Sequence, residues 1–107
     1  RLTFDGINNA IRRKSAGVYA LGANDPQGNF QVKHVGRSDD DLRAELCERI
    51  GSEVMFKYRL FPSARDAFNK ECELFHDFSP PGSRIHPGRP KGTTWECPRC
   101  AIFRATG

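Results

Sequence analysis

The sequence contains no long hydrophobic run, and tryptophan and methionine occur only once each. No apolar stretch approaches the ~18 residues of a membrane-spanning helix, which argues against an integral membrane protein. A signal-peptide pattern is also missing, so we expect an intracellular protein, cytoplasmic or nucleoid-associated. The 107 residues suit one domain with a single modest core.

The charge balance is mildly basic rather than extreme. The chain has 17 Lys and Arg against 13 Asp and Glu, a formal net charge of +4. This bias is compatible with a polyanionic partner such as DNA, although many soluble proteins carry a similar charge. The hydrophobic fraction of 37% and the 8 phenylalanines favour a globular chain over a disordered one.

Local patterns predict an alternation of short helices and strands. The expected elements, in chain order, are a helix over 3–13, a hairpin of strands 18–21 and 30–35, a helix from Ser38, a strand near 54–58 and a helix from Ser63. Ser38 and Ser63 are each followed three residues later by an aspartate, a pattern typical of helix N-caps. These elements predict an α/β (α+β) fold with a small central antiparallel sheet flanked by helices.

Two side chains stand out by the face on which the pattern places them. In the second strand, alternation puts His34 on the same apolar face as Phe30 and Val32. In the last helix, Glu71 lies three residues after Phe68 and borders the buried stripe. A carboxylate in such a place is costly without a partner or ligand, so Glu71 is a candidate functional residue.

The composition changes at Ser79, where a segment rich in proline and glycine begins. Such a segment cannot form a regular helix, and a long irregular stretch on a compact domain needs an anchor. We therefore divide the chain into a core, residues 1–78, and an irregular basic tail, residues 79–107.

The tripeptides Gly17-Val18-Tyr19 and His34-Val35-Gly36 occupy the two strands of the expected hairpin. A Ser-Asp helix start follows the second tripeptide, and a helix that carries a glutamate comes later. This arrangement resembles the GIY-YIG nuclease superfamily over residues 15–78. The resemblance implies a GIY-YIG-like fold and a metal-dependent endonuclease that hydrolyses phosphodiester bonds in DNA.

The resemblance also implies roles for individual residues. Tyr19 takes the place of the tyrosine that helps to activate the attacking water, and His34 replaces the tyrosine of the second tripeptide. Arg37 takes the place of the basic residue that follows, and Glu71 that of the glutamate that binds Mg²⁺ or Mn²⁺. Phosphodiester hydrolysis needs a positioned water, a base, a cation and a divalent ion, so the set is chemically coherent.

One position departs from the family's pattern. The family usually has an arginine three residues after the Asp-Leu pair of the first core helix, and here Glu45 holds that position. Arg43 and Arg49 lie within two helical turns, and either is a candidate to steady the phosphate instead. A carboxylate at this point repels phosphate. The alternative is therefore a catalytically weakened or inactive GIY-YIG-like module that binds nucleic acid or another protein.

The tail ends in a C-x-x-C pair, Cys97 and Cys100, which is half of a zinc-binding pattern. Cys72 and His76 lie four apart on one helical face and suit the other half. We predict a structural zinc site of these four residues, which would anchor the tail to the last helix, with His86 as a competing ligand. The alternatives are a redox dithiol in the C-x-x-C pair and a merely packed thiol at Cys72.

The tail also carries Arg84, Arg89 and Lys91 in an extended segment. Such cations can follow a nucleic-acid backbone, and they can equally belong to a solvated loop. Trp95 can stack on a base, but a tryptophan that covers the metal site or the core is the commoner case.

Overall fold

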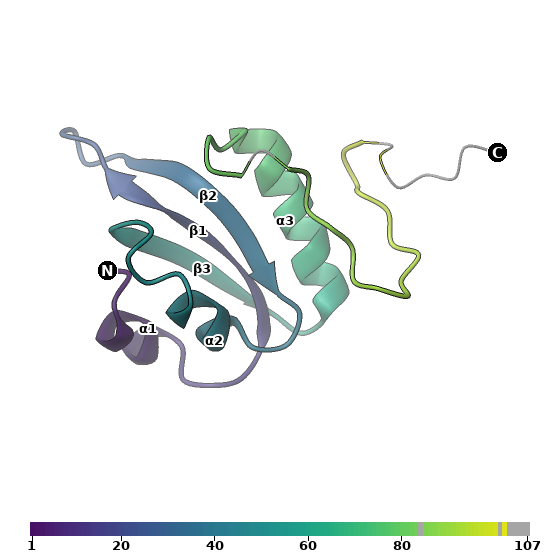
Figure 1. Cartoon of the computed structure of the whole chain (residues 1–107), viewed down its shortest axis with the longest axis horizontal. Helices are drawn as coiled ribbons and strands as arrows, with labels where there is room; N and C mark the ends of the chain where they lie inside the picture. Colours follow the sequence, from purple (N-terminus) through teal and green to yellow (C-terminus); the bar gives the residue numbers. More distant parts are fainter. Residues whose placement is uncertain (84, 101, 103–107) are drawn as a thin grey trace.

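The computed structural model describes residues 1–83, 85–100 and 102. Its elements, in chain order, are α1 (Phe4–Ala10), β1 (Ala16–Asn24), β2 (Phe30–Ser38), α2 (Leu42–Cys47), β3 (Met55–Phe61) and α3 (Ala64–Phe78). The three strands form one antiparallel sheet in the order β2-β1-β3 (Figure 1). The expected α+β fold, a small antiparallel sheet with helices, is confirmed. None of the described helices is long and apolar enough to cross a membrane.

The helices lie on both faces of the sheet (Figure 1). On one face, α1 and α2 contribute Ile7 and Leu42 to a core that includes Tyr19 of β1. On the other face, Ala67 of α3 packs with Val18 of β1. Neighbouring residues on a strand point to opposite faces, so Tyr19 and Val18 belong to different cores. The central strand β1 is accordingly buried on both faces.

Local caps set the helix starts. Ser63 caps α3, as predicted, and Thr3 caps α1, each by accepting a hydrogen bond from a backbone N–H. The predicted cap of α2 is corrected: Asp41 caps this helix by accepting a backbone N–H at 3.2 Å. Ser38 is instead the last residue of β2, where it pairs with Gly17. The helix begins only after the chain has left the sheet.

A β-bulge overturns the predicted face of His34. His34 pairs with Leu21 of β1, and Val32 pairs with the residue after Leu21, so β2 carries one extra residue. Consecutive residues of β1 point to opposite faces, and therefore His34 and Val32 do so as well. The His34 ring lies instead near Glu53, with 3.7 Å between Nε2 and a carboxylate oxygen.

After α3 the chain turns back toward β2, which is an edge strand of the sheet (Figure 1). We call residues 80–83 and 85–88 the strap. Gly82 donates its N–H to the Lys33 carbonyl oxygen at 2.7 Å, and Val35 donates its N–H to Ser83 Oγ at 3.0 Å. The strap thus satisfies backbone groups that an edge strand leaves unpaired.

Candidate active site and candidate metal centre

A polar pocket opens at the β2 edge of the sheet. Its volume is about 300 Å³, and its lining comes from β1, β2, α3 and the region of α2. The lining residues are Tyr19, Val35, Gly36, Arg37, Asp39, Glu45, Arg49 and Glu71. Four side chains that the sequence singles out as catalytic candidates therefore meet in one place, namely Tyr19, Arg37, Arg49 and Glu71.

Tyr19 reaches this pocket by crossing over Gly36. The two residues are paired across β1 and β2, and a Cβ on Gly36 would overlap the phenol ring. The Tyr19 hydroxyl donates a hydrogen bond to Glu45 Oε2 at 2.9 Å. Burial and the Glu45 carboxylate raise the pKa of Tyr19 well above its ordinary value. The phenol therefore keeps its proton at neutral pH.

Replacing Gly36 with alanine is expected to lower the free energy of unfolding by about 1–3 kcal/mol, because the new methyl group forces Tyr19 to move. Urea unfolding followed by circular dichroism measures the loss. Gly88→Ala is the matched control, since a Cβ at that position meets no atom within 4 Å. Equal stability of the two variants would contradict the close packing of Tyr19 on Gly36.

Arg37 and Glu71 form an ion pair in the pocket. Arg37 Nη1 donates to Glu71 Oε1 at 2.7 Å, and Arg37 Nε donates to Asp39 Oδ1 at 2.8 Å. Glu71 is 8% exposed, which confirms its inward place on the helix. Burial raises the pKa of Glu71, and Arg37 partly counteracts this effect. The ion pair with Arg37 thus offsets the free-energy cost of burying the Glu71 carboxylate.

Arg49 lies beside Glu45, one turn further along the chain. Its guanidinium donates to Glu45 Oε2 through Nε at 3.1 Å and through Nη2 at 2.9 Å. Glu45 therefore accepts hydrogen bonds from both Tyr19 and Arg49. The sequence marks Glu45 only as a departure from a family pattern, and no local signal points to its contact with Tyr19. The other two catalytic candidates, Arg43 and His34, do not line the pocket.

The pocket is slightly acidic. Its lining has three carboxylates, from Asp39, Glu45 and Glu71, against the two guanidinium groups of Arg37 and Arg49, a net charge of −1. A phosphodiester is itself an anion. It is therefore accommodated best by this lining together with an added cation.

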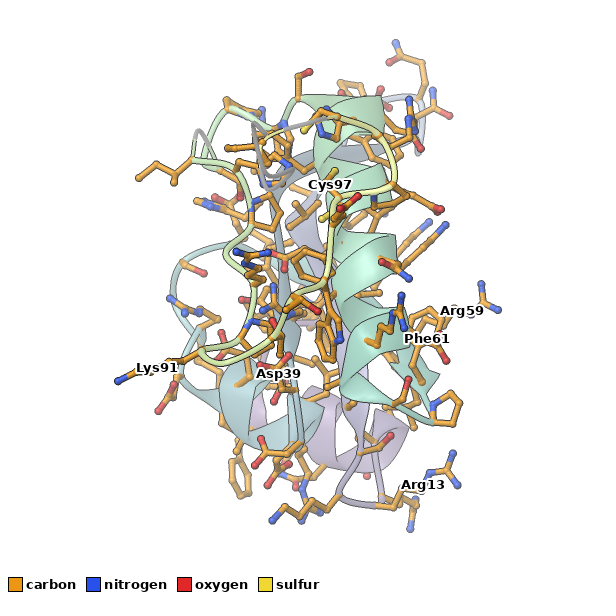
Figure 2. All side chains as sticks on the ribbon, turned by 90° about the vertical axis from the view of Figure 1, so that its right-hand side faces the viewer. Arg13, Asp39, Arg59, Phe61, Lys91 and Cys97 are labelled. Carbon is orange, nitrogen blue, oxygen red and sulfur yellow. The ribbon has the colours of Figure 1, made fainter. Side chains whose placement is uncertain are left out.

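Four metal-ligating side chains gather where the tail meets α3. They are His76 from α3, His86 from the strap, and Cys97 and Cys100 from the end of the tail, and their ligand atoms all lie within 4.8 Å of one another. Cys97 is labelled beside α3 in Figure 2. Its Sγ lies 3.4 Å from His76 Nε2, and Cys100 Sγ lies 3.4 Å from His86 Nε2. This His2Cys2 group could hold a metal ion such as zinc.

The donor set and the distances fit a tetrahedral zinc. With Zn–S at about 2.3 Å and Zn–N at about 2.0–2.1 Å, tetrahedral geometry sets sulfur and nitrogen ligands about 3.6 Å apart. His86 Nδ1 lies 2.9 Å from the Pro87 carbonyl oxygen. Because a carbonyl only accepts, Nδ1 carries the proton and the Nε2 lone pair faces Cys100. This is the tautomer that binds a metal through Nε2.

Cys72 is not part of this group. It is buried next to Cys97, and burial raises the pKa of Cys72 to about 12, so this thiol stays protonated. Burial also opposes ionisation of Cys97, but hydrogen bonds from the backbone N–H groups of Arg99 and Cys100 help to lower the pKa of Cys97 to about 6. The predicted ligand set is thus corrected in one place: His86, the competing ligand, replaces Cys72.

The sequence analysis proposes Arg84, Arg89 and Lys91 of the tail as nucleic-acid contacts, and their surroundings differ. Arg84 falls outside the described residues. Arg89 Nη1 donates to the Trp95 carbonyl oxygen at 3.1 Å and so braces the tail internally. Lys91 is exposed and points away from the body of the protein (Figure 2). Trp95 packs on Phe68 with 5.8 Å between ring centroids, so its ring covers the core.

The pocket and the His2Cys2 group are thus separate sites that share α3 as a common support. The pocket offers hydrogen-bond donors, carboxylates and guanidinium groups, whereas the His2Cys2 group offers soft metal ligands. Comparisons of the chain with protein-family models, with curated proteins and with solved structures give no match.

Proposed function

We propose that this chain is a metal-dependent endonuclease of the GIY-YIG type, which hydrolyses phosphodiester bonds in DNA. The observation that carries the proposal is the polar pocket that brings together Tyr19, Arg37 and Glu71. These are residues to which the sequence resemblance assigns the chemistry, and they come from three separate elements.

Tyr19 and Glu45 form a path for the proton of the attacking water. The Tyr19 hydroxyl donates to Glu45 Oε2, so its oxygen is available to accept a hydrogen bond from water. As the water oxygen attacks phosphorus, the water proton passes to Tyr19 and the phenol proton passes to Glu45. The bond from phosphorus to the leaving deoxyribose oxygen breaks, and that oxygen takes a proton from solvent. Glu45 is then the general base.

Arg37 and Arg49 stabilise the negative charge that develops on the phosphate. Both guanidinium groups are already oriented by carboxylates, so little reorganisation is needed during the reaction. Glu71 would hold Mg²⁺ or Mn²⁺, because one carboxylate together with water and phosphate oxygens suits these ions. When bound, the ion neutralises charge on the phosphate and offsets the acidity of the lining.

Replacing Glu71 with glutamine is expected to slow DNA cleavage at least about 100-fold, because an amide is a much poorer ligand for Mg²⁺ or Mn²⁺. Supercoiled plasmid and short DNA forks serve as substrates with either ion, and EDTA should stop the reaction. Glu73→Gln is the matched control on the same helix, because Glu73 pairs with Lys70 and does not line the pocket. No cleavage with either ion, or undiminished cleavage by Glu71→Gln, overturns the proposal.

One observation favours a second candidate function, a module that binds nucleic acid or a protein without catalysis. Glu45 stands where the family usually has arginine, and it neutralises Arg49 through two hydrogen bonds. Such a pocket offers less positive charge to a phosphate. A mobility shift of labelled DNA by the wild-type chain, with no cleavage under either ion, would support this alternative.

We further propose that zinc is the metal of the His2Cys2 group and that its role is structural. Two thiolates and two imidazoles fill the four positions of a tetrahedral site and leave none open for water. Soft thiolate ligands disfavour Mg²⁺ and Mn²⁺, so the two sites take different metals. The four cysteines are free thiols, which suits the reducing intracellular location that we also propose.

A further inference from the structure

The His2Cys2 group joins three segments that lie apart in the sequence. His76 belongs to α3, His86 to the strap, and Cys97 and Cys100 to the end of the tail. A metal bound by all four holds the strap against α3. The same helix carries Glu71, so the metal centre and the polar pocket are built on one rigid element.

The strap in turn reaches the pocket through Gly88. The Gly88 carbonyl oxygen accepts a hydrogen bond from Arg37 Nη2 at 2.5 Å, and Gly88 lies two residues after His86. On the other side of His86, Ser83 Oγ accepts from the Val35 N–H at 3.0 Å and donates to the Val35 carbonyl at 3.2 Å. In the chain, His86 therefore lies between the contacts of Gly82 and Ser83 with β2 on one side and the contact of Gly88 with β2 on the other.

We infer that metal binding by the His2Cys2 group positions Arg37 in the pocket, with the strap as the connecting segment. The functional meaning of this link rests on the proposed nuclease activity, whereas the link itself does not. Without the metal, only ring contacts with Phe75 and His76 hold His86 to α3, and the Gly88 carbonyl is less firmly held over Arg37. Gly88 is thus a positioning residue that acts through Arg37.

Measurements of the zinc content and of the packing of Trp95 test whether the four residues bind the metal and whether the metal holds the tail on α3. The wild type should bind stoichiometric Zn²⁺, and Cys100→Ser should not. Cys47→Ser is the control and should bind Zn²⁺ like the wild type, because Cys47 lies on α2 and packs against the core between the sheet and helices α1 and α2. With Co²⁺ in place of Zn²⁺, only the wild type and Cys47→Ser should show the absorption bands of a tetrahedral thiolate site. Trp95 is the only tryptophan and packs on Phe68, so its emission should shift to the red in Cys100→Ser.

The Nε–H resonance of Arg37 in a ¹⁵N NMR spectrum tests whether the strap positions Arg37, because Nε belongs to the same guanidinium group as the Nη2 that donates to Gly88. The Nε–H donates to Asp39, and its exchange with solvent should be at least about tenfold faster in Cys100→Ser than in the zinc-loaded wild type. Ser83→Ala keeps all four metal ligands, and it should speed the exchange of the Arg37 N–H without loss of zinc. The rate of DNA cleavage should be lower in those variants in which the Arg37 N–H exchanges faster with solvent.

The outcomes separate this inference from the proposed function. Unchanged exchange of the Arg37 N–H in Cys100→Ser, once zinc is lost, overturns the inference even if the protein cleaves DNA. Faster exchange in Cys100→Ser and in Ser83→Ala supports it even if the wild type cleaves no substrate, in which case only the nuclease proposal fails. Zinc retained in full by Cys100→Ser overturns the ligand set itself.

Discussion

Replacing Phe68 with alanine is expected to lower the free energy of unfolding by about 3–5 kcal/mol, the usual range for a fully buried phenylalanine. Phe68 is 0% exposed and shares a core with Cys72 and Cys97. Its ring packs against Trp95 of the tail, and Arg37 Cζ lies 5.1 Å from its centroid. The cavity left by alanine therefore removes support from the pocket and from the tail together.

Urea unfolding followed by circular dichroism measures this loss, and Trp95 fluorescence reports on the tail separately. Phe78→Ala is the matched control on the same helix, because Phe78 is 53% exposed and should cost less than about 1 kcal/mol. Only Phe68→Ala should release Trp95 at urea concentrations below the main transition. A similar loss of stability in both variants would contradict the central place of Phe68.

Removing the metal is expected to cost the wild-type chain about 4 kcal/mol of stability relative to free Zn²⁺ held at about 1,000 times its Kd. The size follows from mass action, because an ion that binds only the folded state stabilises it in proportion to the logarithm of its free concentration. The four proposed ligands come from α3, the strap and the end of the tail, so the unfolded chain presents no preformed site. The midpoint of thermal unfolding should therefore rise with free Zn²⁺.

The change of the thermal-unfolding midpoint with free Zn²⁺, rather than the midpoint of each variant itself, identifies the ligands. Cys72→Ser is expected to keep the rise of the midpoint with free Zn²⁺, although the buried thiol is lost, because Cys72 lies outside the His2Cys2 group. His86→Ala is expected to abolish it. The reverse pattern, with Cys72→Ser insensitive to zinc and His86→Ala responsive, would show that Cys72 rather than His86 is the fourth ligand.

Features with local causes could be predicted from the sequence. The cap at Ser63 and the inward place of Glu71 depend on residues three or four positions away, and the structure has both. The start of α2 could not be predicted in the same way. Ser38 has the chemistry of a cap, but its pairing with Gly17 in the sheet, a long-range contact, keeps it in β2.

The two sites were harder to predict because some of their residues lie on irregular segments of the backbone, outside regular helices and strands. The bulge in β2 reverses the face of His34, and no sequence pattern in the strand announces it. The four-residue spacing of Cys72 and His76 suggests a ligand pair, since helical spacing can be read from sequence. The strap follows no periodicity, so the approach of His86 to Cys100 is visible only in three dimensions.

The strap along β2 also affects the tendency of the chain to associate with copies of itself. Lys33 and Val35 direct backbone groups to the outer edge of the sheet, and the strap takes them up. An edge strand whose groups are left open is a template on which another chain can add a strand. If the proposed zinc holds the tail in place, it also protects this edge from self-association, and loss of zinc is expected to favour aggregation through β2.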